Sequence, residues 1–335
     1  MKVSFLVTYY NQEQYVRQSL DSILAMDLSA EWEILVGDDG SSDGTAAQVQ
    51  EYVDRDPDRI RLFVMPRESG VRYDPVRRAS VNRLNLVDQS TGDCFCSLDG
   101  DDFYTDTSFI REAVDVLEKD PSISVVSFGF REYRNGTFAD PVLLPVSGII
   151  ETDRYIRGFY IHSGACVHRR IPDGSRTAAI RTIGSFDDND IVMNSLLYGN
   201  MYHIPRAVYA YRQTDDSVYN TMSPLEKAVL NVKGYDINRQ LIGDKYRDAL
   251  LARYVSPIMM AYCARKHLRE KLGETITAKY LSGCPESGES LCRDLLRYPE
   301  LNGPARASVR KLVYRAARQR PVRAAKTAAR TRLKG

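Results

Sequence analysis

The sequence has no long hydrophobic run and none of the common short motifs for phosphate binding. No apolar stretch reaches the roughly 18 residues that a membrane-spanning helix needs. The apolar stretch at the N-terminus is too short for a signal peptide, so we expect a cytoplasmic protein. The chain contains no GxxxxGK[ST] sequence and no GxGxxG after the first predicted strand, which argues against a P-loop and a dinucleotide-binding fingerprint.

Cysteine and histidine are few, and they are not spaced as metal ligands. The six cysteines include no CxxC pair, and Cys94 and Cys96 lie in one apolar segment that we expect to be a strand. The four histidines, among them His162 and His168, form no metal-binding spacing either. We therefore expect buried or incidental thiols and structural histidines, and neither a zinc site nor disulfides.

The net charge of +2 conceals two electrically different parts. Residues 303–335 hold eleven Lys or Arg and no Asp or Glu, which leaves 35 basic against 44 acidic residues in the rest of the chain. With 43% hydrophobic and 27% charged residues, the acidic part can form a substantial core. Because this part is acidic and carries no recognition motif, we do not expect nucleic acid as its partner.

Apolar runs alternate with helical patterns in the first half of the chain. Such an alternation predicts βαβ units, and hence an α/β fold with a mostly parallel sheet and helices on both faces. The expected strands are Val3–Thr8, Glu33–Val36, Ile60–Val64, Cys94–Leu98 and Ile123–Phe130. Further along, we expect a hairpin turn at Asn135–Gly136, a strand over Tyr160–Val167, a helix over Asp188–Tyr198, and one or two strands within Met201–Tyr211 broken by Pro205.

Beyond Pro224 the apolar spacing becomes helical. Residues 225–262 carry the apolar faces of at least two helices. We divide the chain into two halves of an α/β part (1–105 and 106–222), a helical extension (223–302) and a basic tail (303–335). In the tail, Ala305–Gln319 forms an amphipathic basic pattern that would suit an anionic membrane surface. A solvated terminus, or a helix docked on the acidic part, explains the same pattern.

Acidic and aromatic residues follow three of the predicted strands. Ligands of open α/β sheets bind outside the carboxyl ends of the strands. Tyr10 follows the first strand, Asp39 the second, and Asp99, Asp101 and Asp102 the fourth. Three carboxylates within four residues repel one another unless solvent or a cation relieves them, and hard divalent cations prefer such oxygen ligands. A metal held in this way completes its shell with water and phosphates, so the sequence predicts a nucleoside diphosphate as ligand.

Three segments in order resemble the opening of a family 2 glycosyltransferase with the GT-A fold. These segments are Ser4–Asn11, Ser19–Leu24 and Glu33–Thr45, and Leu98–Asp102 is similar to the DxD segment of that family at the expected distance. The resemblance is strong over about the first 110 residues and extends more weakly to about residue 215. It implies an inverting, metal-dependent transferase that uses Mn²⁺ or Mg²⁺.

The resemblance implies that residues 1–105 are the nucleotide-sugar-binding half and residues 106–222 the acceptor-binding and catalytic half. Carried over residue by residue, it also implies roles for individual site residues. Thr8 and Tyr10 would line the nucleotide pocket, and Asp39 would bind the base. Asp99 would face the ribose or the sugar, Asp101 would coordinate the metal on the diphosphate, and Asp102 matches the acidic position that follows. Arg83 fits the arginine of an Ala-Arg-Asn stretch upstream of the fourth strand, although the Asn is absent here. Two interpretations fit the wider basic run, Arg72, Arg77, Arg78 and Arg83: it approaches phosphates, or it forms a solvated helix face. We favour the solvated helix face.

The catalytic base is expected within Phe186–Asp190. The Glu-Asp motif of the family falls on Asp187–Asp188, which places Asp188 in the base position, with Asp187 and Asp190 as alternatives. These aspartates could equally cap the N-terminus of the following helix, and one could cap while another projects into the cleft. Residues 160–164 either line the acceptor cleft or form a plain strand and turn.

The function predicted from these residues is transfer of a sugar from a nucleoside diphosphate donor, most often UDP among relatives, to a hydroxyl of a glycan or lipid-linked glycan, as in cell-surface polysaccharide synthesis. The basic tail would hold the enzyme at the inner face of the cell membrane. The alternatives are a catalytically silent sugar-nucleotide or glycan-binding module and, third, a nucleotidyltransferase. The Gly/Lys-rich phosphate loop that a nucleotidyltransferase needs near the first strand is missing.

Overall fold

The computed structural model describes residues 1–28, 30–67, 75–170, 180–214, 231, 234–235, 237–250 and 252–254. The chain divides into two compact units. One consists of Met1–Thr214 and Gln240–Tyr246, and the other of Asp215–Arg239 and Arg247–Gly335. The four-part division drawn from the sequence stays a prediction.

The first unit is built on one mixed sheet with the strand order β3-β2-β1-β4-β9-β6-β10-β5. The predicted mostly parallel sheet is confirmed, because β3, β2, β1 and β4 are parallel neighbours and β6 is parallel to β10. The antiparallel strands are β9, β5, β7 and β8. The strands are β1 (Val3–Tyr9), β2 (Trp32–Asp38), β3 (Ile60–Val64), β4 (Cys94–Asp99), β5 (Phe103–Tyr104), β6 (Ile123–Arg134), β7 (Thr137–Phe138), β8 (Gly148–Ile150), β9 (Cys166–Arg169) and β10 (Asn200–Arg212).

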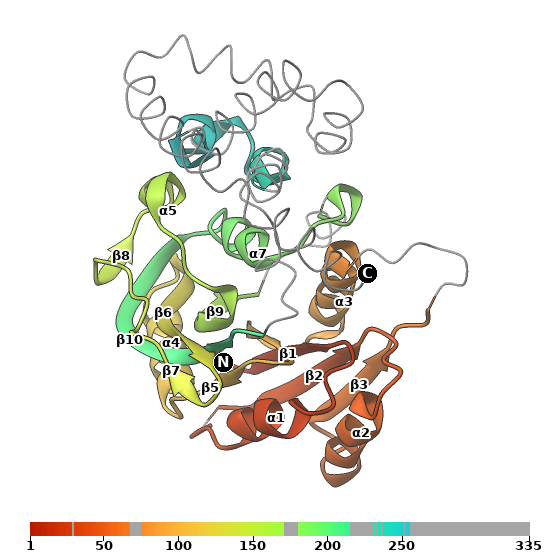
Figure 1. Ribbon diagram of the computed structural model, residues 1–335. Helices are drawn as coiled ribbons and strands as arrows, with labels where there is room; N and C mark the ends of the chain where they lie inside the picture. The colour runs from red at the N-terminus through yellow and green to blue at the C-terminus, as the bar shows by residue number, and fades with distance from the viewer. Residues whose placement is uncertain are drawn as a thin grey trace, which may run out of the picture. The chain divides into compact units, whose positions relative to one another are not determined.

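Helices cover the parallel part of the sheet on both faces, with α1 and α2 on one side and α3 on the other (Figure 1). The described helices of this unit are α1 (Val16–Leu24), α2 (Thr45–Arg55), α3 (Pro75–Gln89), α4 (Phe109–Lys119), α5 (Thr152–Gly158), α7 (Asp188–Ser195) and two 3₁₀ turns, η1 (Ser163–Ala165) and η2 (Asp244–Tyr246). This arrangement follows from the βαβ order. The crossovers move outward from β1 to β3 and then return to β4, which places α3 opposite α1 and α2.

Two segments differ from the sequence prediction. The strand expected over Tyr160–Val167 is divided, because η1 occupies Ser163–Ala165 and pairing begins only at Cys166. In contrast, Met201–Tyr211 is part of one strand, β10, whose pairing with β6 shifts in register between His203 and Ala207. Pro205 lies inside this irregularity, since proline offers no N–H to a sheet ladder and is tolerated at bulges.

The predicted hairpin turn at Asn135–Gly136 is confirmed. It connects β6 to β7, and both turn residues have positive φ, 50° and 83°. Two consecutive positive φ angles are the requirement of the tight hairpin turn that favours the Asn-Gly pair.

A close approach between a strand and a helix fixes the position of α3. The Asn82 side chain, which is 1% exposed, donates a hydrogen bond from Nδ2 to the Gly37 carbonyl of β2 at 2.9 Å. A Cβ atom on Gly37 would lie 2.0 Å from Asn82 Oδ1, so only glycine leaves room for this contact. The packing sets the height of α3 over the sheet, and Arg78 and Arg83 are carried on this helix.

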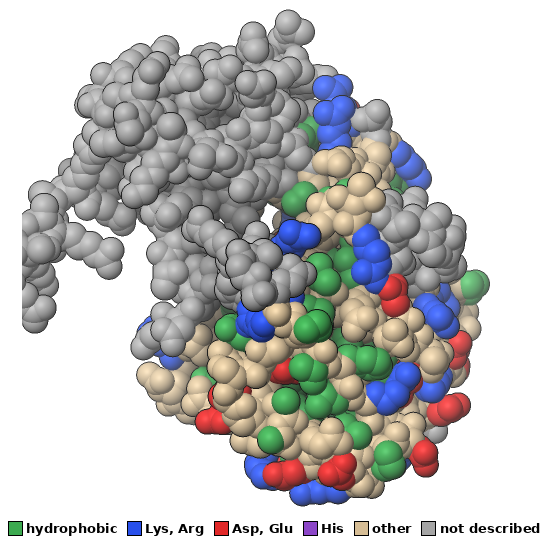
Figure 2. All heavy atoms as spheres, turned by 90° about the vertical axis from the view of Figure 1, so that its right-hand side faces the viewer, with side chains coloured by type: hydrophobic (Ala, Val, Ile, Leu, Met, Phe, Trp, Pro, Cys, Tyr) green, Lys and Arg blue, Asp and Glu red, His purple; other side chains and the backbone are tan. Residues whose placement is uncertain are grey.

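The edge strand β3 is short and lies among charged side chains. Figure 2 views the side of the molecule that is on the right in Figure 1, where hydrophobic side chains gather in the middle of the described surface and charges of both signs border it below. Val64 at the end of β3 is 56% exposed, and Arg61 donates to Glu33 at 2.9 Å. A five-residue edge with charged neighbours disfavours the addition of another strand.

The described residues of the second unit are helical, in line with the expected extension. The Tyr235 and Tyr254 rings pack 5.9 Å apart between centroids, and Asn238 Nδ2 lies 3.2 Å from the Tyr254 hydroxyl. The predicted basic tail, residues 303–335, lies outside the described residues. Among the residues described, no helix combines the length and the hydrophobicity needed to cross a membrane.

Candidate functional site

The predicted site residues gather at the carboxyl edge of the parallel strands. Thr8 of β1 is in register with Gly37 of β2 on one side and with Asp99 of β4 on the other. The loops that follow these three strands therefore leave the sheet side by side. Their carboxylates and aromatic rings come together because they stand at matching ends of neighbouring strands.

At the β1 and β2 ends, two arginines contact the residues expected to bind the nucleotide. The guanidinium of Arg67 lies over the Tyr10 ring at 4.1 Å, and this tyrosine is 38% exposed. Arg78 Nε donates to Asp39 Oδ1 at 2.6 Å, and Asp39 is 3% exposed. Tyr10 is thus a surface ring rather than a core aromatic. Asp39 is a buried carboxylate held by an ion pair.

Arg83 contacts the acidic end of β4. Its Nη2 donates to Asp99 Oδ1 at 2.7 Å, and Thr8 Oγ1 donates to the same oxygen at 3.3 Å. Burial lowers the pKa of Arg83, but the negative charges of Asp99 and Asp188 outweigh this effect and raise it above its ordinary value. The guanidinium is therefore a permanent positive charge between two groups of carboxylates.

The favoured interpretation of the basic run as a solvated helix face is wrong for Arg78 and Arg83, because both form ion pairs with site carboxylates. Of the other two arginines, Arg77 is exposed and Arg72 lies outside the described residues. The physical reason for the error is that α3 packs against β1 and β2, which turns part of a basic surface toward the ends of these strands.

The loop after β4 holds two carboxylates whose pKa values are raised. Burial, followed by the negative charge of Asp99, raises the pKa of Asp101 to about 6. Burial and the charges of Asp101 and Asp99 raise the pKa of Asp102 well above its ordinary value. Asp102 is 1% exposed and accepts hydrogen bonds from the Tyr209 hydroxyl and from the Arg212 backbone N–H, the latter at 2.6 Å.

Arg212 at the end of β10 holds this loop through its side chain as well. Its Nε donates to the Asp101 carbonyl at 2.5 Å, and its Nη2 donates to Gln18 Oε1 at 2.6 Å. The guanidinium also lies 4.5 Å from the Tyr15 ring centroid and 5.1 Å from that of Tyr133. One arginine thus joins the acidic loop to α1 and to β6.

The three aspartates at the N-terminus of α7 have separate tasks. Asp187 caps the helix by accepting from the N–H groups of Asn189 and Asp190, at 3.1 and 3.2 Å. Asp190 completes the capping box, since its Oδ2 accepts from the Asp187 N–H and from Ser185 Oγ, the latter at 2.6 Å. Burial and the charge of Asp187 raise the pKa of Asp190 to about 8, so Asp190 carries a proton at neutral pH. Asp188 takes no part in the cap and projects toward η1.

Asp188 is held by Ser163 and His162. Ser163 Oγ donates to Asp188 Oδ1 at 2.5 Å, and His162 Nε2 lies 3.5 Å from Asp188 Oδ2. Burial by itself would raise the pKa of Asp188, but His162, Arg83 and the Ser163 hydroxyl outweigh it and lower the pKa below its ordinary value. Asp188 is therefore ionised at neutral pH and 27% exposed.

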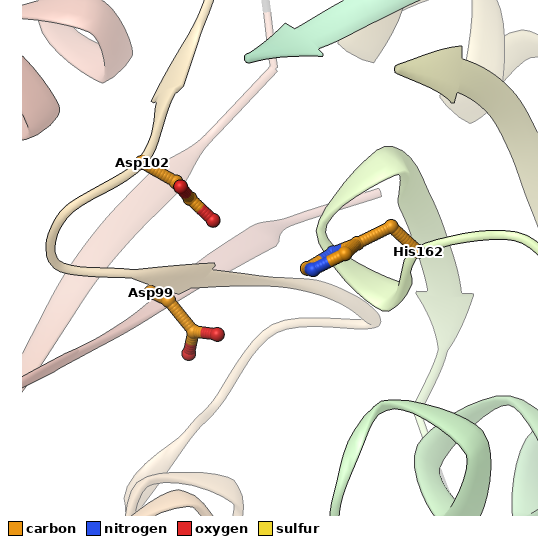
Figure 3. Close-up of side chains that lie close together, drawn as sticks. All are labelled: Asp99, Asp102 and His162. Carbon is orange, nitrogen blue, oxygen red and sulfur yellow. The ribbon is translucent and has the colours of Figure 1, made fainter. Parts of the chain in front are cut away.

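His162 points toward the acidic loop from the opposite side (Figure 3). The ligand atoms of Asp99, Asp102 and His162 lie within 4.8 Å of one another. His162 Nδ1 accepts from the Gly164 N–H at 3.2 Å, so in the neutral ring the proton is on Nε2, the nitrogen that faces Asp188. In this form His162 is a hydrogen-bond donor to carboxylates and not a metal ligand.

The carboxylates of the acidic loop are better ligands for a divalent cation than His162 is. Asp99, Asp101 and Asp102 offer hard oxygen ligands, and burial together with the mutual repulsion of these carboxylates raises the pKa values of Asp101 and Asp102. A cation would offset this repulsion. The sequence expected this metal on these three residues, and the assignment of individual ligands stays a prediction.

Two residues of the site were not assigned a role by sequence reasoning. Residues 160–164 were considered as a lining of the acceptor cleft, but His162 itself was expected to be structural, whereas it lies beside Asp188 and the acidic loop. Arg212 follows the predicted strand segment Met201–Tyr211 and was not expected in the site. No local spacing marks either residue, since His162 meets Asp188 across 26 positions and Arg212 meets Asp101 across 111.

The model of the Glycosyl transferase family 2 matches residues 4–175, slightly more than half of the chain. The chain belongs to this family. The predicted resemblance is thereby confirmed, and the ends of β1, β2 and β4 described above lie within the matched residues.

Curated relatives match parts of the chain at low identity. The putative glycosyltransferase EpsE of Bacillus subtilis is 26% identical over 224 residues, which cover 64% of this chain and 74% of EpsE. A β-1,3-glucosyltransferase of Campylobacter jejuni, named for the substrate GalNAc(5)-diNAcBac-PP-undecaprenol, is 33% identical over 101 residues, 30% of each chain. The chain spans about half the length of uncharacterised mycobacterial relatives, to which it is 26% identical over 172 residues.

Solved structures share the fold. TarS 1–349 of S. aureus in complex with UDP-GlcNAc has a TM-score of 0.60 at 20% identity, covering 92% of this chain and 88% of that one. The mannosyltransferase PcManGT of Pyrobaculum calidifontis, in complex with GDP-Man and Mn²⁺, has a TM-score of 0.50 at 16% identity, covering 91% and 83%. These likenesses establish the GT-A type of α/β fold for this chain.

The raised pKa of Asp190 predicts a pH-dependent stability. In the unfolded chain an aspartate titrates near pH 3.9, so between about pH 4 and pH 8 the folded state holds a proton that the unfolded state has lost. Stability must therefore fall as pH rises through this window. The Asp190→Asn variant keeps an acceptor for Ser185 and cannot ionise, so its melting temperature should fall less between pH 5 and pH 8.5 than that of the wild type. Asp140→Asn, an exposed control, should follow the wild type. Equal slopes for Asp190→Asn and the wild type would contradict the buried proton.

The contacts of Arg212 predict that it holds the acidic loop closed. Arg212→Gln removes the charge-assisted bond to the Asp101 carbonyl, and such bonds contribute about 1.5–3 kcal/mol. Backbone amides of residues 100–104 should then exchange with deuterium roughly 10 to 100 times faster, as measured by mass spectrometry. Arg131→Gln, which changes an exposed arginine on the neighbouring strand, should leave this exchange unchanged. Wild-type protection of the loop in Arg212→Gln would rule out this role.

Proposed function

We propose that the chain is a metal-dependent, inverting glycosyltransferase. It moves a sugar from a nucleoside diphosphate donor, a UDP-sugar, to a hydroxyl of a glycan or lipid-linked glycan during the synthesis of a cell-surface polysaccharide.

One observation carries this proposal. The acidic loop after β4 and the ionised Asp188 at the start of α7 both act on Arg83, which forms an ion pair with Asp99 and is stabilised in its charged form by Asp188. Glycosyl transfer needs a group that neutralises a departing diphosphate and a base for the acceptor hydroxyl. This site offers a carboxylate cluster suited to a cation and, separately, an ionised carboxylate.

The names of relatives support the substrate classes. TuaG of Bacillus subtilis is named as a putative teichuronic acid biosynthesis glycosyltransferase, and the Campylobacter jejuni relative is named for an undecaprenol-linked glycan. TarS was solved with UDP-GlcNAc and PcManGT with GDP-Man. A nucleoside diphosphate sugar as donor and a glycan as acceptor agree with these names.

On the donor side, Tyr10 and Asp39 would receive the base, and Thr8 and Asp99 would face the ribose and the sugar. The exposed face of Tyr10 offers a stacking surface, while Arg67 covers the ring from another side. Asp39 is already bonded to Arg78, so a base that hydrogen-bonds to Asp39 must share this carboxylate with the guanidinium. Arg83 contacts Asp99, and a donor held at Asp99 would therefore bring its phosphates near this guanidinium.

Mn²⁺ or Mg²⁺ would be held by Asp101 with Asp99, and Asp102 would support the loop from behind. When bound, the cation supplies electrostatic stabilisation of the diphosphate leaving group. Asp102 is the least accessible of the three, since both of its oxygens accept hydrogen bonds from β10.

Asp188 would act as the base. Its carboxylate is ionised at neutral pH, oriented by Ser163 and partly exposed, so it can accept the proton of an acceptor hydroxyl while that oxygen attacks the anomeric carbon. A single displacement of this kind inverts the configuration. Asp190 is 1% exposed and protonated, and Asp187 is engaged by the helix N–H groups, so we assign the base to neither.

The basic tail, residues 303–335, would hold the enzyme at an anionic cytoplasmic membrane surface. Each Lys or Arg close to such a surface contributes about 1 kcal/mol. Eleven of them without an acidic residue are sufficient for reversible binding. The second candidate function, a silent sugar-nucleotide-binding module, shares the donor site but has no use for an ionised Asp188.

Replacing Asp188 tests the base. Asp188→Asn keeps the shape and loses the proton acceptor, so turnover of a UDP-sugar with acceptor should fall by about two orders of magnitude or more, while the affinity for the donor stays close to that of the wild type. UDP release measures turnover, and calorimetry measures donor binding. The matched control is Asp190→Asn, which should retain activity. If Asp188→Asn turns over donor as fast as the wild type, another residue is the base. If only Asp190→Asn loses turnover, that base is Asp190.

Replacing Asp101 tests the metal. A ligand that binds only the folded state raises the melting temperature, and at a given concentration it does so more the tighter it binds. For the wild type, a panel of sugar nucleotides should raise the melting temperature with Mn²⁺ and far less with EDTA. Asp101→Ala should lose the Mn²⁺-dependent part of this shift, and the exposed control Asp140→Ala should keep it. If the shift of Asp101→Ala equals that of the wild type, Asp101 does not hold the cation.

A further inference from the structure

Tyr160 is an exposed aromatic residue in an otherwise buried stretch next to the proposed base. It is 43% exposed, whereas Ile161, His162 and Ser163 are exposed by only 1 to 3%. The backbone is extended at Phe159 (φ −101°, ψ 145°) and at His162 (φ −69°, ψ 132°). Tyr160 therefore lies in an open stretch of backbone two residues before His162, the residue that faces Asp188.

Tyr160 closely precedes the two residues that hold Asp188. It lies two residues before His162 and three before Ser163, and both of these contact the Asp188 carboxylate. In agreement with this position, burial and then the negative charge of Asp188 raise the pKa of the Tyr160 hydroxyl above its ordinary value. With 43% of the residue exposed, Tyr160 offers an aromatic surface to solvent beside this carboxylate.

A second aromatic residue borders the same place. The Tyr211 ring lies 4.8 Å from the His162 ring, and burial together with the charges of Asp102 and Asp188 raises the pKa of the Tyr211 hydroxyl to about 12. Both tyrosine hydroxyls therefore remain protonated at neutral pH and can donate hydrogen bonds. The surroundings of Asp188 on this side consist of aromatic rings and hydroxyl donors.

We propose that Tyr160 is the stacking platform of the acceptor subsite, and that the acceptor presents a neutral sugar ring there. The proposal rests on the function proposed above and names the acceptor's chemical class. A pyranose has an apolar C–H face that suits an exposed aromatic ring and hydroxyls that suit a carboxylate, which is the combination offered by Tyr160 and Asp188. A phosphate-bearing polyol has no such face, and its charge would meet Asp187 and Asp188.

The test compares transfer to an acceptor with hydrolysis of the donor. UDP release is measured from UDP-sugars with Mn²⁺, first in water and then with a panel of neutral p-nitrophenyl glycosides or with glycerol and ribitol phosphates. For the wild type, at least one glycoside should accelerate UDP release, and the polyol phosphates should not. Tyr160→Ala should lower the ratio of transfer to hydrolysis about tenfold, mainly through a higher half-saturating concentration of glycoside, because an aromatic contact of this kind is lost.

Two variants control for the fold and for the hydroxyl. Tyr160→Phe keeps the ring and should retain most of the ratio of transfer to hydrolysis. If thermal melts show that Tyr160→Ala is unstable, Tyr160→Leu is used in its place. Phe138→Ala removes an aromatic residue of similar exposure, 40%, and should behave as the wild type.

The outcomes separate the two proposals. If the wild type consumes no sugar nucleotide under any condition, the proposed function fails. If it consumes donor but Tyr160→Ala transfers to glycosides as well as the wild type, the stacking platform is refuted. Acceleration by the polyol phosphates, or by none of the glycosides, would overturn the assignment of a neutral sugar acceptor.

Discussion

The ion pair between Arg83 and Asp99 is the contact on which the rest of the site depends. Three elements that are distant in sequence, α3, β4 and the start of α7, bring one guanidinium and several carboxylates together. Arg83 donates to Asp99 at 2.7 Å, and the charge of Asp188 adds to its stabilisation. A partly buried arginine with this many acidic neighbours cannot be removed without leaving carboxylates uncompensated. Arg83 thereby links the charge of the loop after β4 to that of Asp188 at the start of α7.

The carboxylates differ in charge state because their partners differ. Asp188 receives a hydroxyl donor and faces two basic groups, so its pKa is lowered. Asp101 faces Asp99 and is buried, so its pKa is raised to about 6. Asp190 is enclosed beside Asp187, and its pKa is raised to about 8. The same residue type, aspartate, therefore takes three forms here: an ionised hydrogen-bond acceptor at Asp188, a carboxyl group that a cation would stabilise at Asp101, and a protonated helix cap at Asp190.

Much of the fold could be predicted because its signals are local. Five strands were expected from apolar runs, and the Asn135–Gly136 turn from a residue pair whose conformational preference is intrinsic. The division at Ser163 could not be read in the same way. Tyr160–Val167 was expected to be one strand, but η1 occupies Ser163–Ala165, and there Gly164 packs so closely on Tyr209 that a Cβ would lie 2.3 Å from the ring, a tertiary contact that no local pattern shows. The acidic loop after β4 was noted because its aspartates follow a predicted strand, and Asp188 was singled out only through the family resemblance.

The missed residues show a common limit of sequence reasoning. His162 and Arg212 acquire their roles only through contacts across the fold, and Arg78 looked like part of a solvated surface. Of the two interpretations of the aspartates at the start of α7, the helix cap is confirmed for Asp187 and Asp190, whereas Asp188 takes no part in the cap and its role as the base stays a proposal. Since the cap occupies the residues on either side of Asp188, it also fixes the direction of that side chain. The helix cap thus sets the direction in which the Asp188 side chain leaves the backbone. The hydrogen bond from Ser163 then holds its carboxylate in position.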